Sequence, residues 1–181
     1  LEDIVREAKR CGGIVKSVLQ FARDERTDKW ACRLDDILRR TVRLAHPLCE
    51  SEGAEVDLHL PSDPIWVHVN PIQIEQALVN LVRNALEARS HHIRLRLSAL
   101  EDEGLALVQV DDDGPGIPED ERVRIFEPFY TTRRDEGGTG LGLSVVHGIA
   151  IEHGGQLKIE ANAEGGVAAL LELPRTQPPP V

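Results

Sequence analysis

Two asparagines stand four residues apart inside an otherwise apolar segment, residues 77–86. This segment predicts a helix, and the spacing places Asn80 and Asn84 on one face of it. A lone asparagine in such a place most often satisfies buried backbone groups, whereas two on one face favour contact with a ligand or a metal. An amide oxygen suits Mg²⁺, which typically keeps several waters and takes further ligands from substrate phosphates.

A first glycine tract, residues 111–118 (DDDGPGIP), follows directly after a predicted strand. Its two glycines permit a tight turn and close approach of a ligand to the backbone. An aspartate at this point can accept a hydrogen bond from a ligand amino group. A plain acidic surface turn is the alternative interpretation.

A second glycine tract, residues 137–144 (GGTGLGLS), leads straight into a predicted helix. Exposed N–H groups at a helix start favour binding of phosphate. A Walker loop is excluded because no lysine follows these glycines. A dinucleotide fingerprint is excluded because residues 126–136, which precede the tract, do not form a buried strand.

The chain that must position these groups has 181 residues, of which 41% are hydrophobic and 29% charged. The formal net charge of −10 argues against a nucleic-acid binder or a basic membrane-surface protein. No apolar run approaches the roughly 20 residues that span a bilayer. The three cysteines (Cys11, Cys32 and Cys49) have no C-x-x-C spacing, so we expect reduced thiols and a cytoplasmic location for this part of the protein.

The chain divides into four predicted parts. Residues 1–26 predict a long amphipathic helix whose apolar seam repeats every three or four residues. Residues 27–33 are polar and predict a linker, residues 34–174 predict the main domain, and residues 175–181 predict a disordered tail.

The main domain shows the pattern α-β-β-α-β-β-loop-α-β-β. Strands and helices do not alternate strictly, which makes a doubly wound parallel sheet improbable. We expect an α+β fold, a two-layer sandwich in which helices cover one face of a mixed sheet. The expected helices and strands are 34–52, 55–60, 65–69, 71–88, 93–100, 105–110, 143–152, 156–161 and 167–173.

In their order and spacing these tracts resemble the catalytic domain of sensor histidine kinases. Residues 80–85 (NLVRNA) resemble the N box, residues 112–116 (DDGPG) the G1 box, residues 126–129 (FEPF) the F box and residues 138–144 (GTGLGLS) the G2 box. The resemblance covers residues 34–173 and implies the ATP-binding fold of the GHKL superfamily. It also implies that residues 1–26 are the second helix of a dimerisation and histidine-phosphotransfer hairpin.

The resemblance implies roles for individual residues. Asn84 would bind Mg²⁺, Asp112 would accept from the adenine amino group, residues 126–140 would form a mobile lid, and Arg133 or Arg134 would neutralise phosphate charge. It implies Asn80, Asn84 and Arg133 as catalytic residues. The implied nucleotide-binding residues are Asn84, Asp112, Gly114, Gly116, Ile117, Phe126, Thr132, Arg134, Gly138, Thr139, Gly140, Leu141 and Gly142.

Two departures from the family pattern stand out. Many members have lysine three residues after the metal-binding asparagine, where this chain has Glu87. None of the seven histidines precedes an acidic residue, as the phospho-acceptor of the family does, so we expect the acceptor helix to come from elsewhere. His153 belongs to a glycine turn and is expected to be structural.

The implied function is transfer of the γ-phosphate of ATP to a histidine, for relay to a response regulator, in a protein that forms a homodimer. One alternative is a hydrolytic ATPase of the same superfamily. Those members carry glutamate where this chain has Asn80, and an amide cannot act as a general base. A nucleotide-binding module without catalysis is the second alternative.

Overall fold

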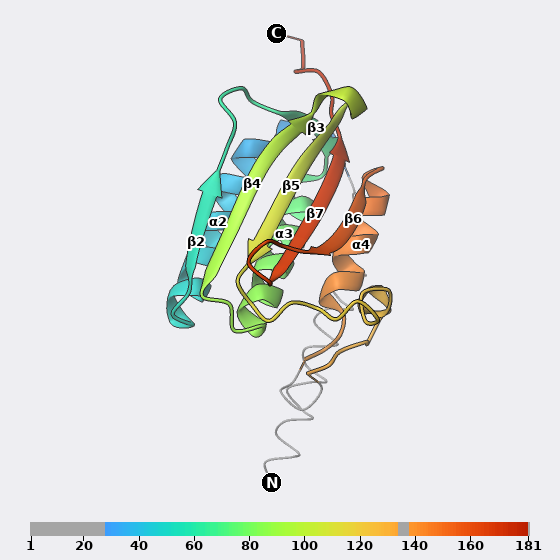
Figure 1. Ribbon diagram of the computed structural model, residues 1–181. Coiled ribbons are helices and arrows are strands. Elements are labelled where there is room, and N and C mark those ends of the chain that lie inside the picture. Colours follow the sequence, from blue (N-terminus) through green and yellow to red (C-terminus); the bar gives the residue numbers. More distant parts are fainter. Residues whose placement is uncertain (1–27, 134–137, 181) are drawn as a thin grey trace.

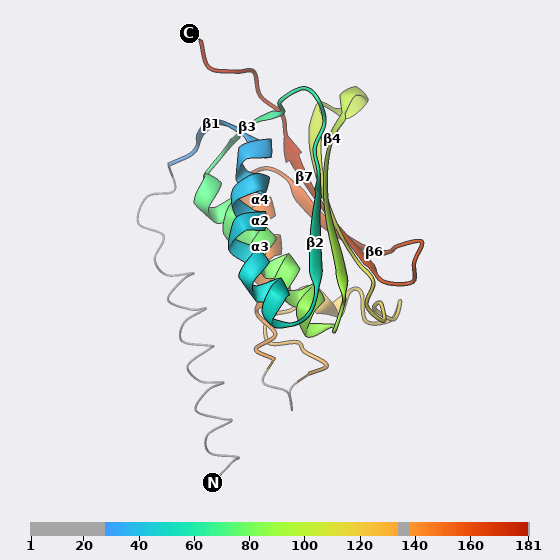
Figure 2. The ribbon, with the colours of Figure 1, turned by 90° about the vertical axis from the view of Figure 1, so that its left-hand side faces the viewer.

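The computed structural model describes residues 28–133 and 138–180, and the helix predicted over residues 1–26 lies outside them. Three long helices cover one face of a five-stranded sheet (Figures 1 and 2). The predicted α+β sandwich is therefore confirmed. The helices are α2 (Leu34–Ser51), α3 (Pro71–Glu87) and α4 (Gly142–Glu152).

The main sheet is mixed and has the strand order β2-β4-β5-β7-β6. β2 pairs with β4 in parallel, and every other neighbouring pair is antiparallel. The strands are β2 (Glu55–His59), β4 (His92–Leu100), β5 (Leu105–Asp112), β6 (Gln156–Ala161) and β7 (Val167–Pro174). Two short 3₁₀ turns, η1 (Glu101–Glu103) and η2 (Arg124–Phe126), follow β4 and β5.

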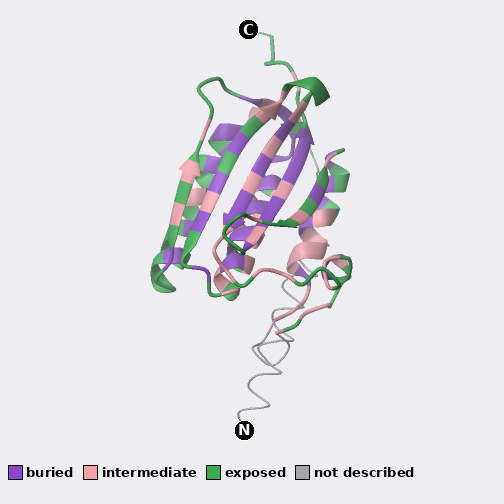
Figure 3. Ribbon diagram, viewed as in Figure 1, coloured by how far each residue is buried: buried purple, intermediate pink, exposed green. Residues whose placement is uncertain are grey.

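The core lies between the sheet and the three helices. Alternate residues of β4 and β5 point into it: Leu95 stands opposite Val110, and Leu97 opposite Val108. Figure 3 shows the corresponding alternation of buried and less buried residues along these strands. Since the period of a strand is two, this alternation fixes which face of the sheet the helices cover.

The start of α3 is set by Asn70 and Pro71. The side-chain oxygen of Asn70 accepts from the backbone N–H groups of Ile72 and Gln73, and proline stands at the first helical position. The described residues contain no helix long and apolar enough to cross a membrane.

The structure differs from the prediction at both ends of the main domain. Residues 30–33, expected in a linker, form β1 (Trp30–Arg33), which pairs with β3 (Trp66–Val69). Arg175 and Thr176, expected in a disordered tail, donate their backbone N–H groups to Gly104 and Trp66. These segments depend on partners far away in the chain, and local sequence patterns do not show such partners.

Candidate functional site

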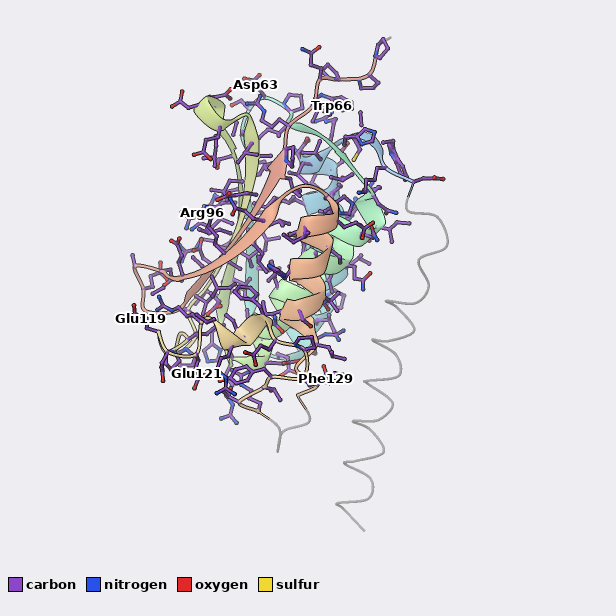
Figure 4. All side chains as sticks on the ribbon, turned by 90° about the vertical axis from the view of Figure 1, so that its right-hand side faces the viewer. Asp63, Trp66, Arg96, Glu119, Glu121 and Phe129 are labelled. Carbon is purple, nitrogen blue, oxygen red and sulfur yellow. The ribbon has the colours of Figure 1, made fainter. Side chains whose placement is uncertain are left out.

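A cavity of about 790 Å³ opens where α3, the start of α4 and the loop after β5 meet. Its size is within the range of small-molecule sites. Glu121 lines the cavity and lies, with Phe129, at the end of the molecule opposite to Asp63 and Trp66 (Figure 4).

Most of the residues that the sequence singles out line this one cavity. They are Asn80, Asn84, Asp112, Gly116, Ile117, Thr132, Arg133, Gly138, Thr139, Gly140, Leu141 and Gly142. Gly114 and Phe126 do not line it, and Arg134 lies outside the described residues. The fold thus brings the N box, the G1 turn and the glycine tract to one place, although 62 positions separate Asn80 from Gly142.

The first wall is the face of α3 that carries Asn80 and Asn84. Within the described residues, neither side-chain amide has a hydrogen-bond partner. Gly142 lies directly against Asn84, because a β-carbon at Gly142 would stand 3.0 Å from the Asn84 side-chain oxygen. A glycine here keeps the space in front of that oxygen open.

The second wall is the start of α4 with the glycines before it. Leu141 occupies the N-cap position without any side-chain cap, so the first N–H groups of α4 have no capping partner. Gly140 has φ +67°, and a β-carbon there would lie 2.5 Å from the Phe129 carbonyl carbon. This contact, with the 2.9 Å hydrogen bond from Phe129 N–H to the Gly140 carbonyl, ties the F box to the glycine tract. The result is an uncapped helix start that can bind an anion.

The third wall is built around Asp112 at the end of β5. Its Oδ1 accepts from the Gly114 backbone N–H (2.8 Å), the Ser90 hydroxyl (3.2 Å) and the Val167 backbone N–H (3.4 Å). Burial raises the pKa of Asp112, and these three hydrogen bonds partly offset the increase. All three donors use the same oxygen, which fixes the orientation of the carboxylate and leaves Oδ2 to accept from a ligand.

The two predicted residues that miss the cavity wall support it indirectly. Gly114 acts through its N–H to Asp112, and a side chain there would meet both Ser90 and Asp112. The Phe126 ring packs against the His147 ring of α4, with centroids 5.2 Å apart. This contact anchors the start of the loop that leads to the glycine tract.

Several residues of the site are not predicted from the sequence. Ser90 and Val167 reach Asp112 from distant parts of the chain, and Asn162 donates to the Asp112 carbonyl oxygen over 2.7 Å. The N-x-x-G-G pattern of residues 162–166 is a turn signal that points to this side-chain-to-backbone role. An apolar wall also went unassigned; its members include Leu81, Ala85, Val110, Ile125, Ile159 and Ala169.

Comparison with known proteins agrees with this geometry. The family described as histidine kinase-, DNA gyrase B-, and HSP90-like ATPases matches residues 69–177. The chain belongs to this family. The sensor histidine kinase CpxA of Escherichia coli (strain K12) is 32% identical over 96% of this chain, which spans 39% of the length of CpxA.

Two solved kinases share the fold and extend the comparison. The catalytic domain of histidine kinase ThkA is 31% identical, with a TM-score of 0.73, over 82% of this chain and 96% of that one. ThkA in complex with the response regulator TrrA gives a TM-score of 0.77 at 29% identity, and the match covers 96% of this chain and 49% of the ThkA chain. Full-length ShkA in complex with AMPPNP gives a TM-score of 0.81 at 26% identity, and the match covers 95% of this chain and 37% of the ShkA chain.

Proposed function

We propose that this chain is the catalytic ATP-binding part of a two-component sensor histidine kinase, which transfers the γ-phosphate of ATP to a histidine. The observation that carries the proposal is the single cavity lined by Asn84, Asp112 and the uncapped start of α4. These three features supply one contact for each part of Mg-ATP: metal, base and phosphates. The binding of AMPPNP by the related ShkA supports this assignment.

The base end of the nucleotide would meet Asp112. The free Oδ2 of this carboxylate would accept a hydrogen bond from the adenine amino group, while the side chains of the apolar wall would enclose the adenine ring. The triphosphate would then lie toward the start of α4, where Gly142 and Leu143 line the cavity and the helix has no side-chain cap.

The metal in this proposal is Mg²⁺, and the residues present fit it. The Asn84 amide oxygen faces the cavity with no partner in the described part of the chain, and Gly142 leaves room in front of it. A hard oxygen ligand of this kind completes a shell made mostly of phosphates and water. When bound, Mg²⁺ supplies positive charge that offsets the charge of the transferring phosphates. Arg133 lines the same cavity and adds a further cation.

Asn80 supports phosphotransfer over hydrolysis. It stands one turn before Asn84 on the cavity wall, where a hydrolytic relative would place a glutamate that activates water. An amide has no useful basicity, so this position gives water no general base. The nucleophile is then a histidine of a dimerisation hairpin, and the complex of ThkA with TrrA supports a response regulator as the final acceptor.

The test is a transfer assay with labelled ATP and a separately produced hairpin that carries an acceptor histidine. With Mg-ATP alone the chain should show neither stable self-phosphorylation nor appreciable hydrolysis. Adding the hairpin should give phosphate that is labile in acid and stable in base, as a phosphorus–nitrogen bond is. Asn84→Ala should abolish transfer.

The alternatives give different results in the same assay. Hydrolysis of ATP by the chain alone at about 1 s⁻¹ or faster would support the alternative that the protein is a hydrolytic ATPase. Nucleotide binding without transfer to any acceptor hairpin would support a module without catalysis.

Deleting residues 1–26 should leave ATP binding intact if the domain boundary is placed correctly.

A further inference from the structure

The aspartate that meets the nucleotide base is the last residue of β5 and keeps a strand partner on one side only, because it pairs with Ile93 of β4 but with no residue of β7. The last residue of β5 paired with β7 is Asp111, opposite Ala168, and Asp112 is the next residue along the chain. Two glycines follow within four positions, so the chain beyond Asp112 offers little intrinsic rigidity. On the side of β7, a contact other than strand pairing must fix the backbone and the carboxylate of Asp112.

That support comes from the turn between β6 and β7, residues 162–166. Asn162, the first residue of the turn, forms four side-chain hydrogen bonds. Its Nδ2 donates to the carbonyl oxygens of Asp112 (2.7 Å) and Val167 (3.1 Å). Its Oδ1 accepts from the N–H groups of Glu164 (3.0 Å) and Gly166 (2.9 Å). Both ends of one amide are thus fully used, and together they join the turn to Asp112.

The turn also packs against Asp112 without a gap. A β-carbon at Gly166 would lie 2.0 Å from the Asp112 carbonyl oxygen, so only glycine fits at this position. The next residue, Val167, gives its N–H to Oδ1 of the Asp112 carboxylate. Asn162 therefore orders the segment that fixes the orientation of the carboxylate, as well as holding the backbone beneath it.

We propose that Asn162 is a positioning residue for recognition of the purine base: it sets the direction in which the Asp112 carboxylate presents Oδ2 to the 6-amino group. The inference rests on the proposed binding of ATP. Asn162 touches neither the nucleotide nor the metal in this arrangement, and it acts only through Asp112. Its loss should therefore reduce discrimination at the base rather than binding of the phosphates.

The experiment compares ATP with ITP, which carries a carbonyl in place of the 6-amino group. Both affinities are measured by calorimetry for the full chain and for Asn162→Asp, which is isosteric but turns an oxygen toward the two carbonyls. Asn162→Ala serves as a second variant without that repulsion, and thermal unfolding shows that each variant is folded. Glu164→Gln, in the same turn, keeps every hydrogen bond of Asn162 and is the matched control.

The expected result for the Asn162 variants is a loss of about tenfold in ATP affinity, which corresponds to the free energy of one hydrogen bond to a charged group. The affinity for ITP should change by less than about twofold. Glu164→Gln should keep the full preference for ATP. Equal losses for ATP and ITP would show a merely structural role and overturn the inference, and so would an unchanged preference in both Asn162 variants. If the parent chain binds neither nucleotide, the proposed function itself fails.

Discussion

The backbone N–H of Asn70 donates to Nε2 of His153 over 3.1 Å, although 83 residues separate the two. Because Nε2 accepts, the ring proton is on Nδ1, which donates to the Ile149 carbonyl oxygen 2.7 Å away. One buried imidazole thus joins the start of α3 to the end of α4, the two helices that carry the walls of the cavity. The buried position of His153 and the contacts of both its ring nitrogens agree with the structural role expected of it.

Replacing this ring should cost stability. His153→Ala leaves the buried backbone N–H of Asn70 without its partner, which lowers the free energy of unfolding by about 1–3 kcal/mol, while the Ile149 carbonyl oxygen keeps the backbone N–H of residue 153. Denaturant unfolding measures the difference. His91→Ala removes an exposed ring at the end of the α3–β4 connection and is the control. Equal stability of both variants would contradict a structural role for His153.

Asp112→Asn should weaken ATP strongly without weakening the fold. The asparagine keeps an oxygen for the three donors around Oδ1 but turns an N–H₂ group toward the adenine amino group. Loss of a charge-assisted hydrogen bond costs about 1.5–3 kcal/mol of binding free energy. The free energy of unfolding should stay equal or rise, because a partly buried charge is removed. Calorimetry that finds equal ATP affinity would remove Asp112 from the site.

The same carboxylate predicts a pH dependence. Burial raises the pKa of Asp112, so as the pH falls the folded protein binds this proton before the unfolded chain does. Protonation of Asp112 therefore favours the fold at low pH, and that contribution is lost as the pH rises through the folded pKa. ATP affinity should change in the opposite sense and fall on acidification, starting above the ordinary aspartate pKa. ATP affinity is measured at each pH for the parent chain and for Asp112→Asn, and the difference between them is free of the titration of the nucleotide itself. Affinities that change with pH in the same way in both proteins would contradict the prediction.

Two glycines of α4 give opposite expectations for the same substitution. Gly142→Ala places a methyl group 3.0 Å from the Asn84 side-chain oxygen, so Mg-ATP affinity should fall by about tenfold, the weight of one charge-assisted contact. Gly148→Ala meets nothing within 4 Å and should stabilise the helix by about 0.5–1 kcal/mol with ATP affinity unchanged. Titrations with ATP at low and high Mg²⁺ separate metal from nucleotide. Unchanged metal dependence in Gly142→Ala would place the metal elsewhere.

Glu87→Lys should tighten nucleotide binding. Glu87 lines the cavity one turn after Asn84, where a negative side chain repels phosphates. Reversing its charge should raise ATP affinity by about twofold to fivefold, the weight of a solvent-exposed ion pair, and added salt should reduce the gain. Asp102→Lys makes the same change of charge in η1, away from the cavity, and is the control. An equal gain in both variants would indicate net charge alone.

Much of this fold could be predicted because its signals are local. Asn70-Pro71 sets the start of α3, and alternation in β4 and β5 sets the buried face, so both follow from periods of two and 3.6 residues. The positions of Asn84, Asp112 and the glycine tract follow in turn from the ends of those elements.

The parts that were missed depend on contacts between distant residues. Residues 30–33 have no strand pattern of their own and become β1 only beside β3. From the sequence, Asn162 is predicted to be only a turn residue, and the pairing of β5 with β7 is what brings it to Asp112. Tertiary partners of this kind decide local structure where propensity is weak.

β3 also has a mechanical meaning. β1 pairs along it, and Thr176 donates its N–H to the Trp66 carbonyl, so the chain enters and leaves this fold at one corner (Figure 2). Trp66 lies at the opposite end of the molecule from Glu121 and the cavity mouth (Figure 4). The segments that lead into and out of the described domain therefore join it at the end opposite to Glu121. A displacement of either segment would reach the residues of the cavity only through the body of the domain.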